Sequence, residues 1–211
     1  GRYHHANRQG NGRMKAQLDF NDYPDITEGD IFWRPPPSAL QQVPQLYERA
    51  TSALYMLFLS GGSDIPIRDG VPAALHVAMH VRAALTEFVG IEEAMKNAGH
   101  AYRITSSASP LLHFMRMLRN YQIHIGSQPM ARKTVDIIFG GKDAVIEVAT
   151  IDNLHADDFM QLDTMRKYNS YSRNEVERMI DLFREQQERL GVYEILRQGT
   201  DRLIYEVLQH I

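Results

Sequence analysis

The spacing of apolar residues changes once along this chain, and this change constrains the fold most. Over most of the sequence apolar residues recur every three or four positions, the period of a helix packed on one side. Between Lys133 and Thr150 the period becomes two on both sides of Gly140-Gly141, which is typical of a β-hairpin. The pattern predicts a mainly α fold, a helical bundle with one inserted β-hairpin at about residues 133–150. A lone hairpin is marginal in water, so we expect this one to pack on the helices or on another chain.

Capping signals predict where the helices begin and end. Ser38 and Ser172 each open a capping-box sequence, and Pro110 suits the first helical position after an N-cap at Ser109. Gly126 suits the left-handed residue that follows a helix end. The expected helices are Ser38 to about Ser60, Pro72 to about Gly99, Ser109 to about Gly126, Ala156 to about Tyr168, and Ser172 onward with an interruption at Gly191.

Residues 1–36 read as an irregular segment, because Pro35-Pro36-Pro37 stops a helix from beginning earlier. The stretch from Gly1 to Arg13 is polar, and we interpret it as a vector-derived leader with Met14 as the natural start. Residues 37–211 are expected to form a single helical domain with the inserted hairpin and C-terminal helices.

Composition excludes several classes of protein. The chain has 211 residues and no cysteine, so disulfides, thiolate metal sites and cysteine nucleophiles are ruled out. The longest uncharged apolar-rich run, Ala50 to Ser63, is too short to span a bilayer as a helix. No charged-then-apolar leader opens the chain, so we expect a cytoplasmic protein without membrane association. A net charge of −3 disfavours a general nucleic-acid coat protein.

The charges are unevenly distributed. Between Glu93 and Asp136 there is no acidic residue. A locally positive surface in this stretch would attract a polyanion. In the alternative interpretation, acids on neighbouring helices neutralise it. The stretch carries Lys96, Arg103, Arg116, Arg119, Arg132 and Lys133, together with His100, His113 and His124.

Arg119, Asn120 and His124 form the candidate site, in the last two turns of a predicted helix. Arginine keeps its charge, whereas histidine exchanges a proton near neutral pH, so the set can hold a phosphate and move a proton beside it. Asn120 and His124 are four residues apart and share a helix face, whereas Arg119 is rotated from His124 by about 140°. In the alternative interpretation, His124 stabilises the helix dipole and Arg119 pairs with an acid on a neighbouring helix.

The segment Leu118-Arg119-Asn120-Tyr121-Gln122-Ile123-His124 resembles the motif of the HEPN (higher eukaryotes and prokaryotes nucleotide-binding) superfamily. That motif is an arginine, a polar residue directly after it, and a histidine after four to six intervening residues. The resemblance implies a helical bundle that dimerises and brings two motifs into one cleft. It also implies a metal-independent endoribonuclease of a toxin–antitoxin or defence system. Arg119 and His124 would then be catalytic and Asn120 would orient them. The hairpin and the long C-terminal part depart from the minimal four-helix pattern.

Such an enzyme needs no cofactor and no metal, because RNA carries its own nucleophile in the 2′-hydroxyl. The expected partners are RNA or a nucleotide, a second copy of the chain, and an antitoxin or other partner protein. Arg116 and His113 lie one or two turns before the motif and would extend a phosphate track. The alternative function is a non-catalytic helical module that binds a nucleotide, RNA or a partner protein. A metal site at His76 and His80, four apart on a helix, is a weaker hypothesis.

Overall fold

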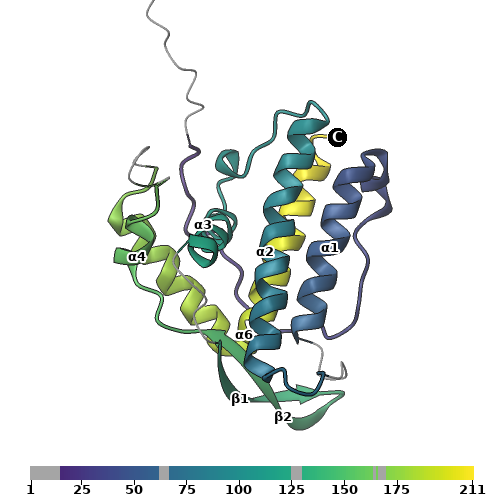
Figure 1. Cartoon of the computed structure of the whole chain (residues 1–211), viewed down its shortest axis with the longest axis vertical. Coiled ribbons are helices and arrows are strands. Elements are labelled where there is room, and N and C mark those ends of the chain that lie inside the picture. Colours follow the sequence, from purple (N-terminus) through teal and green to yellow (C-terminus); the bar gives the residue numbers. More distant parts are fainter. Residues whose placement is uncertain (1–14, 62–66, 125–129, 164, 166–169) are drawn as a thin grey trace, which may run out of the picture.

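The computed structural model describes residues 15–61, 67–124, 130–163, 165 and 170–211, with only the helical backbone of residues 122–124. It is mainly α with one antiparallel hairpin, as predicted (Figure 1). The elements in chain order are the 3₁₀ helix η1 (Ser38–Gln42), α1 (Pro44–Gly61), α2 (Ala73–Asn97), the 3₁₀ helix η2 (Ile104–Ser106), α3 (Pro110–His124), β1 (Met130–Phe139), β2 (Lys142–Ile151), α4 (Ala156–Met160) and α6 (Arg173–Leu208).

The predicted start of the first α-helix was wrong. The segment that begins at Ser38 is a 3₁₀ helix without a side-chain cap, and the α-helix begins only at Pro44. Proline disfavours helical backbone in the residue before it. Val43 is accordingly extended, with φ −122° and ψ 92°, which separates η1 from α1. The second predicted helix is confirmed, with Pro72 at the N-cap of α2.

The capping box at Ser172 is confirmed at the start of α6. The Ser172 hydroxyl accepts from the Glu175 amide at 3.1 Å, and the Ser172 amide donates to the Glu175 carboxylate at 2.8 Å. The interruption at Gly191 is also confirmed, since its φ of 83° breaks the helical backbone. A Cβ at this position would lie 2.8 Å from Val148 Cβ, so only glycine admits the hairpin this closely.

The hairpin packs on the helices, which agrees with the expectation that a hairpin by itself is only marginally stable in water. Strands β1 and β2 pair from Met130 opposite Ile151 to Phe139 opposite Lys142, and the two turn glycines both have positive φ. The buried side-chain amide of Gln187 on α6 donates to the Ile151 carbonyl at 2.8 Å and accepts from the Ile151 amide at 2.9 Å. The side chain of Gln187 thus makes the two backbone hydrogen bonds that a neighbouring strand would make, and these bonds attach the base of the hairpin to α6.

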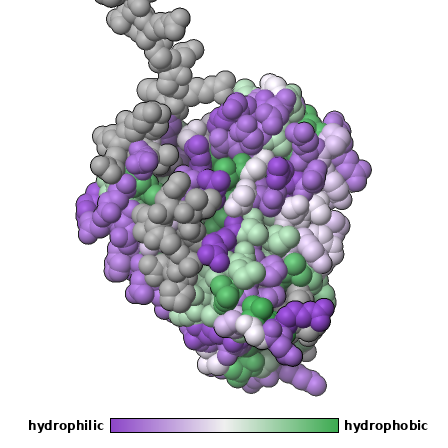
Figure 2. Space-filling model, in the orientation of Figure 1, coloured by the Kyte–Doolittle hydropathy of each residue, from purple (hydrophilic) through white to green (hydrophobic). Residues whose placement is uncertain are grey.

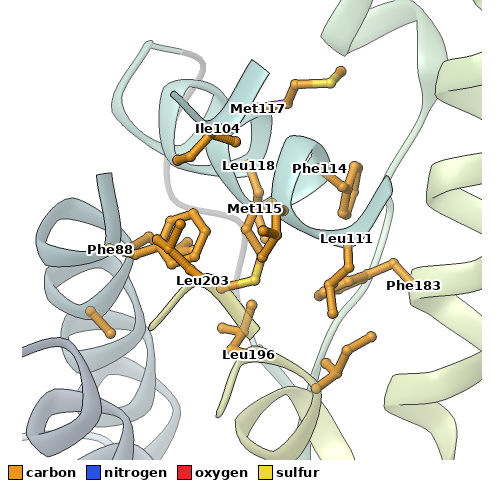
Figure 3. Packing of buried hydrophobic residues seen from close by; sticks show 14 of the residues in the cluster. Phe88, Ile104, Leu111, Phe114, Met115, Met117, Leu118, Phe183, Leu196 and Leu203 are labelled. Carbon is orange, nitrogen blue, oxygen red and sulfur yellow. The ribbon is translucent and has the colours of Figure 1, made fainter. Parts of the chain in front are cut away.

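The core lies where α3 crosses α2 and α6. Figure 3 shows Met115 and Leu118 of α3 directed toward Phe88 of α2 and Leu203 of α6, all of them buried. A Cβ at Gly199 of α6 would meet the Met115 sulfur at 2.2 Å. The glycine therefore permits the close approach of α3 and α6.

The segment from residue 15 to residue 37 contains no helix or strand, and several hydrogen bonds join it to α6. The Ile26 amide donates to the Gln186 side chain at 2.7 Å, and the Tyr193 hydroxyl donates to the Asp30 carbonyl at 2.9 Å. These bonds supply backbone partners that an irregular segment otherwise lacks.

Gly126, the predicted end of the third helix, lies outside the described residues. The fourth helix begins at Ala156 as predicted, but its predicted length was wrong, because α4 ends at Met160 with a turn at Gln161 instead of continuing to about Tyr168. None of the helices in the described part of the chain is long and apolar enough to cross a membrane.

Candidate functional site

The end of α3 carries the predicted motif. Pro110 opens this helix, as the sequence predicted, and the helix continues to His124. Leu118 and Tyr121 are buried on either side of Arg119 and Asn120, which are both partly exposed. Burial of these apolar neighbours therefore turns positions 119 and 120 outward. The side chain of His124 lies outside the described residues, so its orientation remains a prediction from helix periodicity.

Arg119 is incompletely paired. One guanidinium nitrogen, Nη1, donates to the Asn120 side-chain oxygen at 3.1 Å. The Nε atom is buried and has no hydrogen-bond partner among the described residues, and none of their carboxylates forms a salt bridge with Arg119. An unsatisfied buried donor is unfavourable for the fold alone, and a ligand or a residue outside the described part can relieve that cost.

Arg119 lines a polar groove with a volume of about 500 Å³ between α1 and α2. Arg49 of α1 lies in the same groove, where its side chain rests on Gly90 of α2 and donates to Glu87 at 2.8 Å. Glu48 and Glu93 also line it, so the groove has mixed charge. Its cations, Arg49 and Arg119, can hold a phosphate group. Sequence reasoning missed Arg49, because nothing near it in the chain points to position 119.

A larger hollow than this groove lies elsewhere in the described structure. It has a volume of about 1170 Å³ and lies between the hairpin, residues 26–32 and the interruption in α6. Its lining is mainly apolar and includes neither Arg119 nor Asn120. Size therefore does not identify the candidate site, and we place the site at Arg119 on the chemistry of its side chains.

His113 does not fit the predicted phosphate track. Its side chain is fully buried, and its ring nitrogens lie 2.8 Å from the Ser107 carbonyl and 2.6 Å from the Tyr171 hydroxyl. A carbonyl only accepts, so Nε2 carries the proton and Nδ1 accepts from Tyr171. Burial lowers the pKa of His113 to about 4, despite the bond to Ser107, so the ring is neutral at physiological pH. His113 is a core histidine that holds the start of α3 against Tyr171.

Arg116 is better placed than His113 to bind a phosphate, because its side chain is partly exposed, but Glu92 faces it. Its Nη2 is 3.9 Å from Glu92 of α2, and the side chain is 37% exposed. Glu92 also accepts from the Ile104 amide at 3.0 Å, which keeps the carboxylate in place. Arg116 can reach solvent, but its field is partly cancelled by Glu92.

Three further basic residues of the acid-free stretch are paired with acids, whereas Arg103 donates to the carbonyls of His100 and Tyr102 and has no acidic partner among the described residues. Lys96 lies 3.6 Å from Glu93, and Arg132 and Lys133 form salt bridges with Glu147 and Glu188. The alternative interpretation, in which neighbouring acids neutralise this stretch, therefore holds for these cations. Arg119 remains the cation of the stretch that has no acidic partner among the described residues and also lines a groove.

His76 and His80 gain no third metal ligand among the described residues. His76 Nε2 lies 3.3 Å from the Leu59 carbonyl and His80 Nδ1 lies 2.8 Å from the His76 carbonyl, so both rings contact backbone. Within the described residues no group of three or more histidine and carboxylate side chains is arranged to hold a metal ion.

No family model, curated protein or solved structure matches this chain. The HEPN assignment therefore remains a prediction, based on residues 118–124 and the kind of helices around them.

Proposed function

We propose that this chain is a HEPN-type endoribonuclease that cuts RNA without a metal, with Arg119, Asn120 and His124 as its reacting groups. The observation that carries the proposal is the incompletely paired guanidinium of Arg119 at a polar groove. A structural arginine is expected to have an acid or several carbonyls as partners, and the described residues supply Arg119 with one amide oxygen.

The chemistry follows from the three side chains. The 2′-hydroxyl of RNA attacks the adjacent phosphorus while its proton goes to a base, and the 5′-oxygen leaves with a proton from an acid. His124 is assigned one of these proton transfers. Arg119 stabilises the charge that develops on the phosphate oxygens. The products are a 2′,3′-cyclic phosphate and a 5′-hydroxyl.

Asn120 positions the guanidinium. Its side-chain oxygen accepts from Arg119 Nη1, so its amide nitrogen keeps two N–H donors, which have no partner among the described residues. The amide therefore restricts how Arg119 turns and can itself donate to a phosphate oxygen. A second copy of the motif would supply a second arginine and histidine, so we expect activity to reside in a dimer with facing motifs.

The test measures cleavage of single-stranded RNA by purified protein in the presence of EDTA. We expect His124→Ala and Arg119→Ala each to reduce the rate by roughly 100-fold or more, and Asn120→Ala by about 10-fold. His80→Ala is the matched control, since it also removes a helical histidine, and it should cut RNA at the wild-type rate. Cleavage that is lost with EDTA, or retained in His124→Ala, would overturn the assignment.

The groove supports a second candidate, a module that binds a nucleotide without cutting RNA. Arg49 and Arg119 face the same groove within one chain, so a small phosphorylated ligand can be held without a dimer. In that case wild-type protein leaves RNA intact. A fluorescent nucleoside triphosphate binds, and both Arg49→Ala and Arg119→Ala weaken its binding.

A further inference from the structure

The hairpin has two strands and therefore two edges. Between residues 131 and 149 the backbone bonds pair β1 with β2, and no other hydrogen bond joins these backbone groups to the described residues. Unpaired edges are templates for another strand. The hairpin tip also exposes apolar side chains: Ile138 is 76%, Val145 65% and Phe139 55% exposed. Figure 2 shows hydrophobic atoms at this lower end of the molecule among hydrophilic ones.

Contacts to α6 define the two faces of the hairpin. Lys133 forms a salt bridge with Glu188, and Val148, which lies opposite Lys133, packs on Gly191. Odd-numbered positions of β1 therefore face the helices. Because side chains alternate along a strand, the even-numbered positions face away, and Arg132, Thr134, Asp136 and Ile138 are all exposed.

Charge selects one way for β1 to pair with a second copy of itself. Two identical antiparallel strands are related by a two-fold axis, so each side chain lies opposite one of the same face. With the axis at Thr134, Arg132 of each copy lies opposite Asp136 of the other. No other centre within β1 places opposite charges together. An axis at Lys133 puts lysine on lysine, and an axis at Asp136 puts aspartate on aspartate.

Strand β2 offers no such pairing. Its one cation, Lys142, lies opposite Phe139 and shares that strand face with it. Asp143 and Glu147 lie on the other face, so two-fold pairing of β2 cannot bring Lys142 opposite either acid. Centres at Asp143 or Glu147 place like charges together. If the hairpin pairs with the hairpin of a second copy of the chain, the charge pattern favours pairing through the β1 edge.

We propose that the outer edge of β1 is a binding surface for a second copy of this chain, paired antiparallel about Thr134 into a four-stranded sheet. Asp136 has no ion-pair partner among the described residues and takes Arg132 of the second copy. Arg132 already pairs with Glu147 across the hairpin, and it then lies between two carboxylates.

This surface is separate from the motif. In the paired strands the two Met130 residues, each of which follows α3 in its own chain, lie about 26 Å apart along the strand direction. They stand at opposite ends of the new sheet. The β1 pairing therefore does not depend on the motif cleft. A chain that uses both interfaces forms a tetramer or an open assembly, and one that uses β1 alone forms a dimer.

Cysteine cross-linking tests the register directly, because the chain has no cysteine of its own. Thr134→Cys lies on the two-fold axis, where opposite Cα atoms are close enough for a disulfide. We expect most of this variant to become a covalent dimer under mild oxidation at micromolar concentration. Ile138→Cys is the matched control on the same strand and face, far from its own copy, and should remain monomeric on denaturing gels. Equal cross-linking of both variants, or of neither, would overturn the register.

Charge reversal tests the pairing itself. Asp136→Arg places two arginines opposite each other and should raise the dimer dissociation constant at least 10-fold in light scattering or sedimentation. The double variant Arg132→Asp with Asp136→Arg restores opposite charges and should recover dimerisation. Thermal melts confirm that each variant folds. A double variant no better than Asp136→Arg, or a wild-type monomer up to 100 µM, would reject the proposal. RNA cleavage is scored separately, so failure here leaves the proposed function untouched.

Discussion

The two ends of α3 each present a basic side chain that the sequence marks as a phosphate contact, yet their surroundings are opposite. His113, near the start, is fully buried, and both ring nitrogens have partners. Arg119, near the end, is partly exposed and keeps one buried nitrogen without a partner among the described residues. A satisfied polar group stabilises the fold, whereas an unsatisfied one beside a groove is available for a ligand.

The difference comes from what packs on each end. Ser107 and Tyr171 enclose the start of α3, and for His113 the Ser107 carbonyl is the acceptor and the Tyr171 hydroxyl is the donor. At the other end, Arg119 faces a groove between α1 and α2 instead of a third element. Stability and function are thus expected to separate along a single helix, and the following variants test that separation.

The largest expected effect on stability is at His113. His113→Leu leaves the Ser107 carbonyl and the Tyr171 hydroxyl buried without a partner, and we expect a loss of about 3 kcal/mol in the free energy of unfolding. Chemical denaturation measures it. Tyr171→Phe is the matched control, because it removes one hydroxyl and keeps the ring, and should cost about 1 kcal/mol. A loss below about 0.5 kcal/mol in His113→Leu would contradict the structural role.

The next effect is a pH dependence of the difference between wild type and His113→Leu. The pKa of His113 in the folded protein is lowered to about 4. Below pH ~6.5 this histidine therefore binds a proton in the unfolded chain but not in the folded one. Wild type therefore loses on the order of 2 kcal/mol of stability between pH 6.5 and pH ~4.5, and the variant lacks this loss. The difference in the free energy of unfolding between wild type and His113→Leu should therefore become smaller as the pH falls.

Comparing the two proteins cancels the titration of carboxylates that they share. Denaturation curves at pH 7.5, 6 and 4.5 give the difference in the free energy of unfolding between the two proteins at each pH. If the difference in the free energy of unfolding stayed constant across this range, the lowered pKa of His113 in the folded protein would be contradicted.

The smallest stability effect is expected at Arg119. Arg119→Leu removes one hydrogen bond to Asn120 and an unsatisfied Nε, so the free energy of unfolding should change by less than about 0.5 kcal/mol. Arg202→Leu is the control, because Arg202 is a half-exposed helical arginine that binds Asp22 and Glu206. Arg202→Leu should lower the free energy of unfolding by about 1 kcal/mol. A larger loss at Arg119 than at Arg202 would mean that Arg119 is structural.

Sequence reasoning succeeded where the signal was local. The capping box at Ser172, the first-turn proline of α3 and the period-two strands were all confirmed, because each depends on neighbours within a few residues. It failed at Ser38, where Pro44 prevented the α-helix from starting with the capping box. It also failed at His113, because the sequence does not show that Tyr171 closes over that ring.

By itself, the sequence determined the order of helices and hairpin, the interruption at Gly191 and the position of the Arg119–His124 motif near the end of a helix. These follow from periodicity, backbone preference and capping, which act over a few residues. Only the tertiary structure decided that His113 is buried, that Glu92 faces Arg116 and that Arg49 shares a groove with Arg119. Those pairings join residues distant in the chain, and burial and electrostatics depend on distance in space.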